Sequence, residues 1–275
     1  MINLSAIFII ITLFISLILP PAFLIVYALR NEKQGIWSAW LLGALGFVVP
    51  QILIRLPILT GLSKFAGFAA FAQNHPVPYG FGLAFTAGLF ELTGRYAVAR
   101  CLNLTYRRAL AAGLGHGGIE AILITGLAYL SNVVFLVMLQ TGGFDAALTQ
   151  TGDASQLLAA RDALMNTHWA LFLLAGFERL LAMTCHVAMS MMVCYGVHTN
   201  RVLPWTLACL ALHTCMDSVA CISLFIGRGL TLATAYTIIY ILLTAITVLS
   251  IGILKNIRSR WEAESAQEVP YDSQA

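Results

Sequence analysis

Long apolar segments separated by short polar connections run through this 275-residue sequence and limit what it can fold into. Most of them reach the length of about 20 residues that an α-helix needs to cross the hydrocarbon layer of a membrane. Inside that layer each backbone N–H and C=O group must be paired within the chain, and α-helices achieve this. The sequence therefore predicts an all-α, polytopic bundle of about seven transmembrane helices.

The predicted spans cover about 4–29, 36–59, 80–100, 106–140, 167–196, 203–226 and 230–254. The second span contains Pro50, Arg55 and Pro57, so it is expected to be kinked or packed inside the bundle. The connection 141–166 is the one substantial loop and is expected to contain a short surface helix. Residues 1–254 are predicted to form a single bundle with a catalytic core at about 80–226, followed by a polar tail, 255–275, whose segment 261–275 is expected to be disordered.

Composition excludes several classes of protein. The chain is 60% hydrophobic and 10% charged, whereas soluble domains average about 45–50% and 25%. A soluble enzyme, a disordered protein, a coiled coil and a nucleic-acid-binding domain are therefore excluded, and the lipid bilayer is the expected partner. The six cysteines form no CxxC pair, and we interpret them as small buried hydrophobic residues.

Basic residues are distributed unevenly between the two sides of the predicted bundle. Nine lie in the first, third and fifth connections and the tail, against three, Lys64, Arg161 and Arg228, on the other side. Because cytoplasmic connections are enriched in Lys and Arg, the N-terminus is predicted to be outside and the C-terminus in the cytoplasm.

A few charged residues fall inside the predicted spans, where each costs at least about 2.5–3.5 kcal/mol on insertion scales. They are Arg55, Glu91, Arg95, Glu120, Glu178, Arg179 and Asp217, accompanied by His116, His186 and His213. Residues this costly usually face the interior of a bundle and carry function. Arg55 is expected to stabilise the kinked second span, and Glu178 is expected to be a structural partner of Arg179.

The spacing of these residues places pairs on single helix faces. Residues four or seven apart lie on one side of an α-helix. The pairs are Glu91 with Arg95, His116 with Glu120, Arg179 with His186, and His213 with Asp217. At 1.5 Å per residue, Glu91, His116, His186 and His213 lie roughly 12 to 18 Å from the predicted cytoplasmic ends of their spans. One polar site inside the membrane is therefore predicted, and the glycines around His116 leave room there for close helix packing or for a substrate backbone.

Three kinds of chemistry fit such a site. A buried glutamate can act as general base toward a trapped water, with histidines and a carboxylic acid stabilising the oxyanion. His and Glu on one helix face can also bind zinc. Acid and histidine relays occur in proton- or cation-coupled transporters as well, although no inverted repeat is visible in the sequence. The HExxH motif of one class of zinc protease is absent.

The ordered motifs resemble those of the CAAX-protease and bacteriocin-processing superfamily of intramembrane proteases. That superfamily has Glu-x-x-x-Arg or Lys on one helix, Phe-x-x-x-His or Glu on the next, and His-x-x-x-Asn or Asp later. The phrase GLGHGGIEA, the Glu178–Arg179 pair and His186 are most similar to its YhfC-like family. The resemblance covers the third to sixth spans and implies a bacterial cell-membrane endopeptidase acting on a membrane-associated protein or peptide.

The resemblance also implies roles for the site residues. Glu91 matches the glutamate that activates water, with Arg95 orienting it, and Glu120 takes the acid position of the second motif. His213 and Asp217 match the pair that stabilises the oxyanion, while His186 lies between the outer motifs. His116 replaces the usual phenylalanine, and Phe90 stands where many relatives have a second glutamate.

These departures leave open whether the predicted protease requires a metal ion. The preferred interpretation is a glutamate-type intramembrane protease with no required cofactor and no metal ligand, because the pattern also contains an aspartate and an arginine that no zinc shell requires. A zinc-dependent protease using the same residues is the first alternative. A proton- or cation-coupled membrane transporter is the second.

Overall fold

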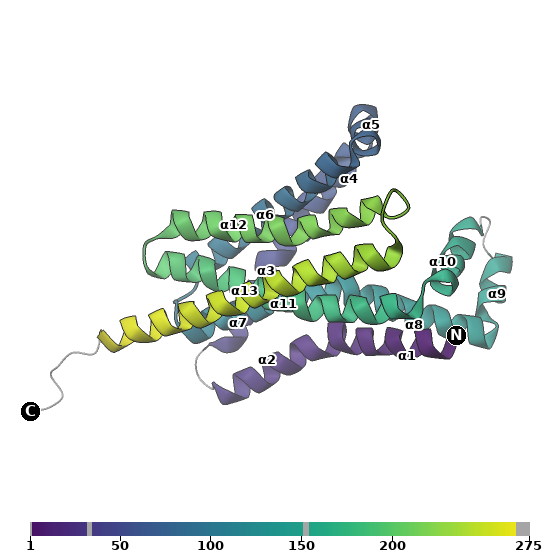
Figure 1. The fold of residues 1–275 in the computed structure, drawn as a ribbon. Coiled ribbons are helices and arrows are strands. Elements are labelled where there is room, and N and C mark those ends of the chain that lie inside the picture. Colours follow the sequence, from purple (N-terminus) through teal and green to yellow (C-terminus); the bar gives the residue numbers. More distant parts are fainter. Residues whose placement is uncertain (1, 32–34, 151–153, 268–275) are drawn as a thin grey trace, which may run out of the picture. The chain divides into compact units, whose positions relative to one another are not determined.

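The computed structural model describes residues 2–31, 35–150 and 154–267 (Figure 1). In these ranges the chain forms α-helices, three π-helical segments and one 3-10 helix, and contains no β-strand. The all-helical prediction is therefore confirmed. The chain divides into two compact units, and three helices contain or adjoin the divisions: α2, α7 and α11.

Unit 1 comprises the residues up to Phe23 together with Glu120–Leu180. Its elements are α1 (Ile2–Leu13), η1 (Phe14–Ile18), the start of α2 (Leu19–Arg30), η3 (Ala121–Gly126), α8 (Leu127–Thr141), α9 (Gly143–Gln150), α10 (Ser155–Asn166) and the first part of α11 (Trp169–His198). Its small core includes Ile9, Leu136 and Phe172. The buried Thr12 hydroxyl donates a 2.6 Å hydrogen bond to the Phe172 carbonyl, which joins α1 to α11.

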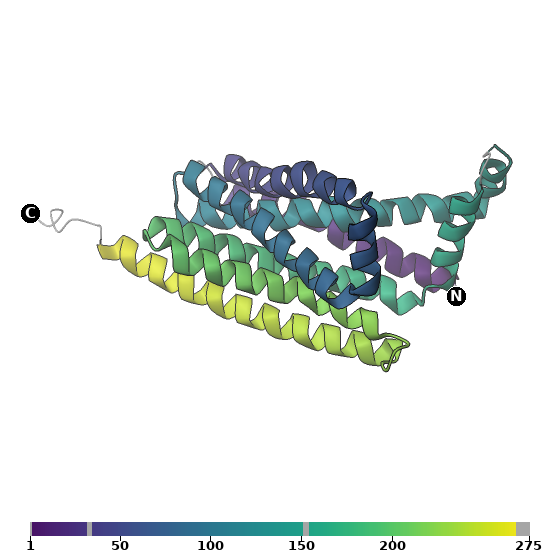
Figure 2. The same ribbon diagram turned by 90° about the horizontal axis from the view of Figure 1, so that it is seen from above.

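Unit 2 comprises Leu24–Ile119 and the residues from Leu181 onward. Its further elements are α3 (Ile36–Phe47), η2 (Val48–Arg55), α4 (Leu56–Leu62), α5 (Ala66–Asn74), α6 (Pro76–Cys101), α7 (Tyr106–Glu120), α12 (Val202–Ser218), η4 (Val219–Phe225) and α13 (Leu232–Gln267). The second half of α11 is its centre: Met189, Met191 and Val193 are fully buried there, in a core shared with α6, α7, α12 and α13. Figure 2 shows α12 and α13, green and yellow, running beside this half of α11.

Six helices in the described residues are long and apolar enough to cross a membrane. They are Leu4–Arg30, Ile36–Leu62, Tyr106–Thr141, Trp169–His198, Val202–Phe225 and Leu232–Glu264. The remaining predicted span, 80–100, corresponds to the 26-residue helix α6. Its glycines, Glu91, Arg95 and Arg100 lower its hydropathy, so composition alone does not identify α6 as a span. The count of seven spans and the orientation of the termini stay predictions.

The second span contains a π-helical segment, η2, which includes Pro50, while the kink itself stays a prediction. Proline lacks a backbone N–H and so breaks the regular hydrogen-bond ladder. Arg55, at the end of η2, is buried and donates a 2.7 Å hydrogen bond to the Leu83 carbonyl of α6. Its guanidinium also contacts the Thr86 hydroxyl at 3.2 Å. The structural role predicted for Arg55 is thus consistent with these contacts, which fix the π-helical segment against α6.

Glycines allow α3 to approach α7 and α6 until their backbones touch. A Cβ added at Gly115 would lie 2.0 Å from the Trp40 carbonyl oxygen. One added at Gly43 would lie 1.9 Å from the Ala112 oxygen, and one at Gly94 would lie 1.9 Å from the Gly46 oxygen. Close approach at small residues is typical of helices packed within a membrane, and it draws α6 and α7 together.

Two expectations about the polar segments have different outcomes. The 141–166 loop contains the short helices α9 and α10, as expected. The predicted disorder of 261–275 is wrong at its start, because α13 continues to Gln267. Trp261 is buried against unit 2 and extends the packed surface of α13 beyond its apolar stretch. Residues 268–275 lie outside the described part of the chain, as does Asp153 of the loop.

The six cysteines are free thiols, and only half of them are buried. Cys185, Cys194 and Cys209 are buried as expected, whereas Cys101 and Cys215 are exposed and Cys221 is intermediate.

Candidate active site in unit 2

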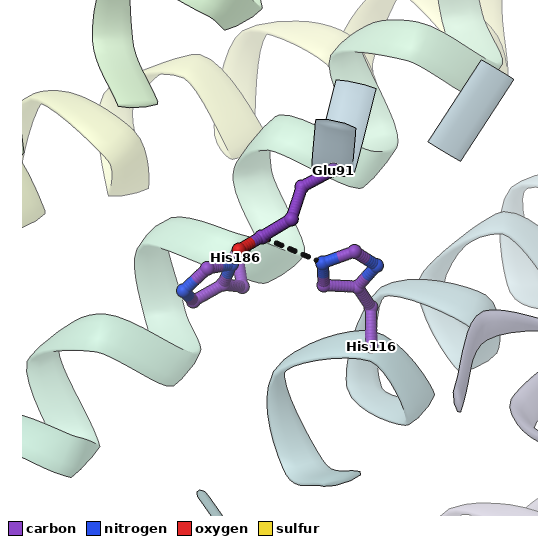
Figure 3. A group of neighbouring side chains, drawn as sticks. All are labelled: Glu91, His116 and His186. Carbon is purple, nitrogen blue, oxygen red and sulfur yellow. Dashed lines mark hydrogen bonds and ion pairs between the residues drawn. The ribbon is translucent and has the colours of Figure 1, made fainter. Parts of the chain in front are cut away.

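Five buried polar side chains from four helices of unit 2 converge on one point. Glu91 and Arg95 come from α6, His116 from α7, His186 from α11 and His213 from α12. None is more than 3% exposed. The predicted convergence of four spans is therefore confirmed for these residues, and Figure 3 shows Glu91 pointing toward His116 and His186.

The carboxylate of Glu91 lies at the centre of this cluster. Its Oε2 atom is 3.0 Å from His116 Nε2 and 3.1 Å from Arg95 Nη2. His186 Nδ1 lies 3.6 Å and His213 Nδ1 3.8 Å from the same oxygen. One carboxylate oxygen therefore faces three imidazole nitrogens and one guanidinium. A buried carboxylate is tolerated only with such compensation.

Arg95 connects the members of the cluster. Besides Glu91, its Nη2 contacts His186 Nδ1 at 2.6 Å, and its Nη1 contacts His213 Nδ1 at 3.3 Å. Arginine can only donate hydrogen bonds, so each Nδ1 atom acts as an acceptor here. The Nδ1 lone pairs of His186 and His213 are thus both directed toward Arg95.

Asp217 orients His213 from the far side of its ring. Because His213 Nδ1 is an acceptor, a neutral ring carries its proton on Nε2. That nitrogen lies 3.3 Å from Asp217 Oδ2. A carboxylate in this position fixes the tautomer and the orientation of a functional histidine. The side chain of Asp217 is 30% exposed, whereas that of His213 is 1% exposed.

Glycines make room for the histidines. A Cβ added at Gly117 of α7 would lie 2.9 Å from the Cβ of His186. On α6, one added at Gly88 would lie 3.4 Å from the Cβ of His213. The rings of His116 and His186 stack with centroids 5.6 Å apart, and Phe47 meets the His116 ring edge-on at 5.5 Å. The phrase GLGHGGIEA thus serves close helix packing, one of the two uses predicted for its glycines.

Three members of the cluster have the donor set of a metal site. The ligand atoms of Glu91, His116 and His186 all lie within 4.8 Å of one another (Figure 3). Zinc binds His nitrogen and carboxylate oxygen at about 2.0–2.2 Å, so two ligands of a tetrahedral site lie roughly 3.3 to 3.6 Å apart. The separations of 3.0 and 3.6 Å from Glu91 to the two histidines bracket this range. These residues fit a zinc ion, although Arg95 donates to two of the same atoms.

A small cavity borders the cluster between α3, α6, α7 and α11. Its volume of about 10 Å³ is close to the room that a single water molecule requires. Arg95, His116 and Ser190 line it. Among the described residues, Arg95 Nε and Ser190 Oγ, both buried, have no hydrogen-bond partner. Sequence reasoning missed Ser190, which lies in the apolar run AMSMMVCY without a charged neighbour to mark it.

Glu120 belongs to unit 1, where it takes part in a different group of charges. Its Oε1 lies 3.3 Å from Arg179 Nη1, and Arg179 Nη2 lies 2.6 Å from Glu178 Oε1. The predicted pairing of Glu178 with Arg179 is therefore confirmed. Two of the helix faces predicted from spacing cross the boundary between the units. His116 and His186 belong to unit 2, whereas Glu120 and Arg179 belong to unit 1. A catalytic role for Glu120 stays a prediction.

Comparison with known proteins gives two matches. A family model described as "YhfC intramembrane metalloprotease" matches residues 15–245. A protein of Bacillus subtilis (strain 168), described as "Uncharacterized membrane protein YhfC", is 33% identical over 235 residues, which are 84% of this chain and 89% of that protein. No solved structure matches. The chain is thus an integral membrane protein of bacterial type, and its place in the wider superfamily stays a prediction.

Proposed function

Because the chain belongs to the YhfC family, described as intramembrane metalloproteases, we propose that it is a metal-dependent peptidase that cleaves a peptide bond within the membrane. The observation that carries the proposal is the convergence of Glu91 Oε2, His116 Nε2 and His186 Nδ1 in a buried core. These three atoms would hold the metal. This proposal replaces the preference for a metal-free glutamate mechanism, which the family description does not support.

A divalent metal held there would supply a Lewis acid that activates water for attack on a peptide carbonyl. The residues of the chain supply the remaining functions. Arg95 and His213, both within 3.8 Å of the Glu91 carboxylate, are placed to stabilise negative charge that develops on the carbonyl oxygen. Asp217 keeps His213 in the orientation that this requires. The substrate is a membrane-associated protein or peptide.

A metal-free mechanism is favoured by one observation only. Arg95 Nη2 lies 2.6 Å from His186 Nδ1 and 3.1 Å from Glu91 Oε2, where it shares the atoms that a metal needs. In that second candidate function Glu91 is the general base, oriented by Arg95.

The test combines metal analysis with cleavage. The full-length protein is purified, its zinc content is measured, and cleavage of a tagged reporter with one apolar span is followed with and without a chelator. We expect Glu91→Gln to lose metal and cleavage, and Glu262→Gln to retain both. Glu262 is the matched control because its side chain is 62% exposed and pairs with Arg258 at the surface of α13.

Two results would count against the proposal. Cleavage by Glu91→Gln at the wild-type rate would remove the site assignment altogether. Wild-type cleavage that ignores the chelator, together with no cleavage by Glu91→Gln, would favour the glutamate mechanism.

A further inference from the structure

A second site lies at one end of unit 2, where α11 ends, α12 begins and the last turns of α13 pass. It is a pocket of about 590 Å³, within the range of about 300–1,000 Å³ that is typical of small-molecule sites. Its lining includes Tyr195, His198, Arg201, Trp205, Arg260 and Glu264. None of these residues belongs to the buried cluster around Glu91.

The turn between α11 and α12 fixes the position of Arg201. Asn200 adopts a left-handed conformation with φ 55°, which asparagine tolerates better than most residues. The backbone N–H of Arg201 then donates a 2.8 Å hydrogen bond to the Gly196 carbonyl. Arg201 is therefore held at the edge of the pocket by backbone bonds.

The walls of the pocket are aromatic and ordered. Tyr195 and Trp205 meet edge to face with ring centroids 5.3 Å apart. His198 stacks on Trp261 at 4.5 Å, with only 9° between the two rings. Such contacts restrain these side chains without using their hydrogen-bonding atoms.

The acidic residue that lines the pocket, Glu264, already has partners. The Tyr195 hydroxyl donates a 2.7 Å hydrogen bond to Glu264 Oε1, and His198 Nε2 lies 3.5 Å from Glu264 Oε2. Among the described residues, neither Arg201 nor Arg260 forms an ion pair with an acidic side chain. Arg260 also hydrogen-bonds the Tyr195 side chain, so the pocket offers a ligand the Arg201 guanidinium and the remaining N–H groups of Arg260.

Helix α12 adds a further positive contribution. It is 17 residues long and begins directly after Arg201, with no side-chain hydrogen bond capping its first turn. The first N–H groups of a helix lack partners within it and carry a partial positive charge, which favours anions; in α12 these are the N–H groups of Val202 and Leu203, because Pro204 has none. Two guanidinium groups beside such an end are an arrangement suited to a phosphate.

We propose that this pocket binds a phosphate group, carried by an anionic phospholipid headgroup or by a free phosphate compound. The pocket lies at the end of the bundle that the basic residues predict to be cytoplasmic, where anionic lipid headgroups collect around basic pockets between helices. Trp205 and Tyr195 provide the amphipathic wall that suits this level of the membrane. The proposal is independent of the peptidase function.

The experiment measures thermal stabilisation of the detergent-solubilised full chain. The probes are dihexanoyl phosphatidic acid, dihexanoyl phosphatidylcholine and inorganic phosphate, each titrated separately. We expect a saturable rise in Tm with phosphatidic acid and a smaller rise with phosphatidylcholine, whose choline offsets the phosphate charge. A rise with phosphatidic acid that inorganic phosphate does not reproduce identifies a lipid headgroup, and an equal rise with inorganic phosphate identifies a free phosphate. Either result supports the proposal.

Variants connect the effect to the pocket. The double variant Arg201→Gln with Arg260→Gln is expected to weaken the apparent affinity about tenfold or more, while the corresponding double Lys variant retains part of it. Arg258→Gln is the matched control, because Arg258 lies on α13 two residues from Arg260, is 64% exposed and pairs with Glu262. No rise with any probe, or an equal loss of affinity in Arg258→Gln, would overturn the proposal.

Discussion

At the scale of single residues, Arg95 is the side chain on which the chemistry of the site depends. Its guanidinium donates to Glu91 and to two histidines, so it neutralises a carboxylate that would otherwise be a costly isolated charge. The same contact places a cation where the proposed metal ligands converge. Arg95 and a bound metal therefore repel each other across a few ångströms in a buried environment.

This repulsion predicts that Arg95→Gln binds zinc more tightly than the wild-type protein. Two charges about 4 Å apart interact by roughly 4 kcal/mol at an effective dielectric constant of 20, so an increase in affinity of at least about tenfold is expected. Competition against a chromogenic zinc chelator measures it on purified protein. Arg258→Gln controls for the general loss of a positive charge, and an affinity for zinc that is unchanged or lower in Arg95→Gln would contradict the prediction.

The sequence predicted most of these residues because of their cost in a membrane. Glu91, Arg95, His116, His186, His213 and Asp217 stand out in apolar helices, and their spacing placed them on common faces. The sequence could not predict which residue each of these side chains contacts. His116 on α7 lies 3.0 Å from Glu91 on α6, a contact that depends on how these two helices pack. Ser190 was missed because an uncharged serine adds little to the free-energy cost of placing a helix in the membrane, so it does not stand out in an apolar run.

At the scale of helices, the packing of α3 against α7 depends on glycines that leave no space for a side chain. A Cβ at Gly115 would meet the Trp40 carbonyl oxygen, and a backbone atom cannot rotate away as a side chain can. Because α7 carries His116, any shift of α7 also moves a member of the active-site cluster. Helix packing and site geometry are therefore coupled through this contact.

Gly115→Ala is accordingly expected to destabilise the protein by about 1–3 kcal/mol or more, as overpacking does in other cores. Gly252→Ala on α13 is the matched control, because a Cβ there meets nothing within 4 Å and alanine favours a helix over glycine by about 1 kcal/mol. Thermal unfolding of both variants in the same detergent measures the difference. Equal Tm values for the two variants would show that α3 and α7 adjust to the extra methyl group.

The sequence located the helices better than their irregularities. Pro50 marked the second span as irregular, but the sequence did not predict that the irregularity is a π-helical segment reaching Arg55, whose guanidinium donates to the Leu83 carbonyl of α6. The end of α13 was missed because its last turns are polar. They remain helical where Trp261 packs against His198 and Tyr106, contacts that only the tertiary structure creates.

At the scale of the whole chain, the basic residues predict the direction in which the helices cross the membrane. A reporter that is active only in the cytoplasm, fused after Ala275, is expected to be active in cells. The same reporter inserted after Gln150, in the connection between α9 and α10, is expected to be inactive. The opposite pattern would reverse the orientation, and activity at both positions would contradict the three spans predicted between them, because two sites on one side are separated by an even number of spans.

The burial of the cluster also limits how fast other molecules can reach it. With Glu91, Arg95 and the three histidines at most 3% exposed, ions, water and peptide reach the reacting atoms only after helices separate. Exchange with the surroundings is then limited by the frequency of that opening, which is set by the packing of α6, α7, α11 and α12 and not by diffusion. For the proposed peptidase, each cleavage cycle would therefore include an opening of this helix packing before the peptide can enter.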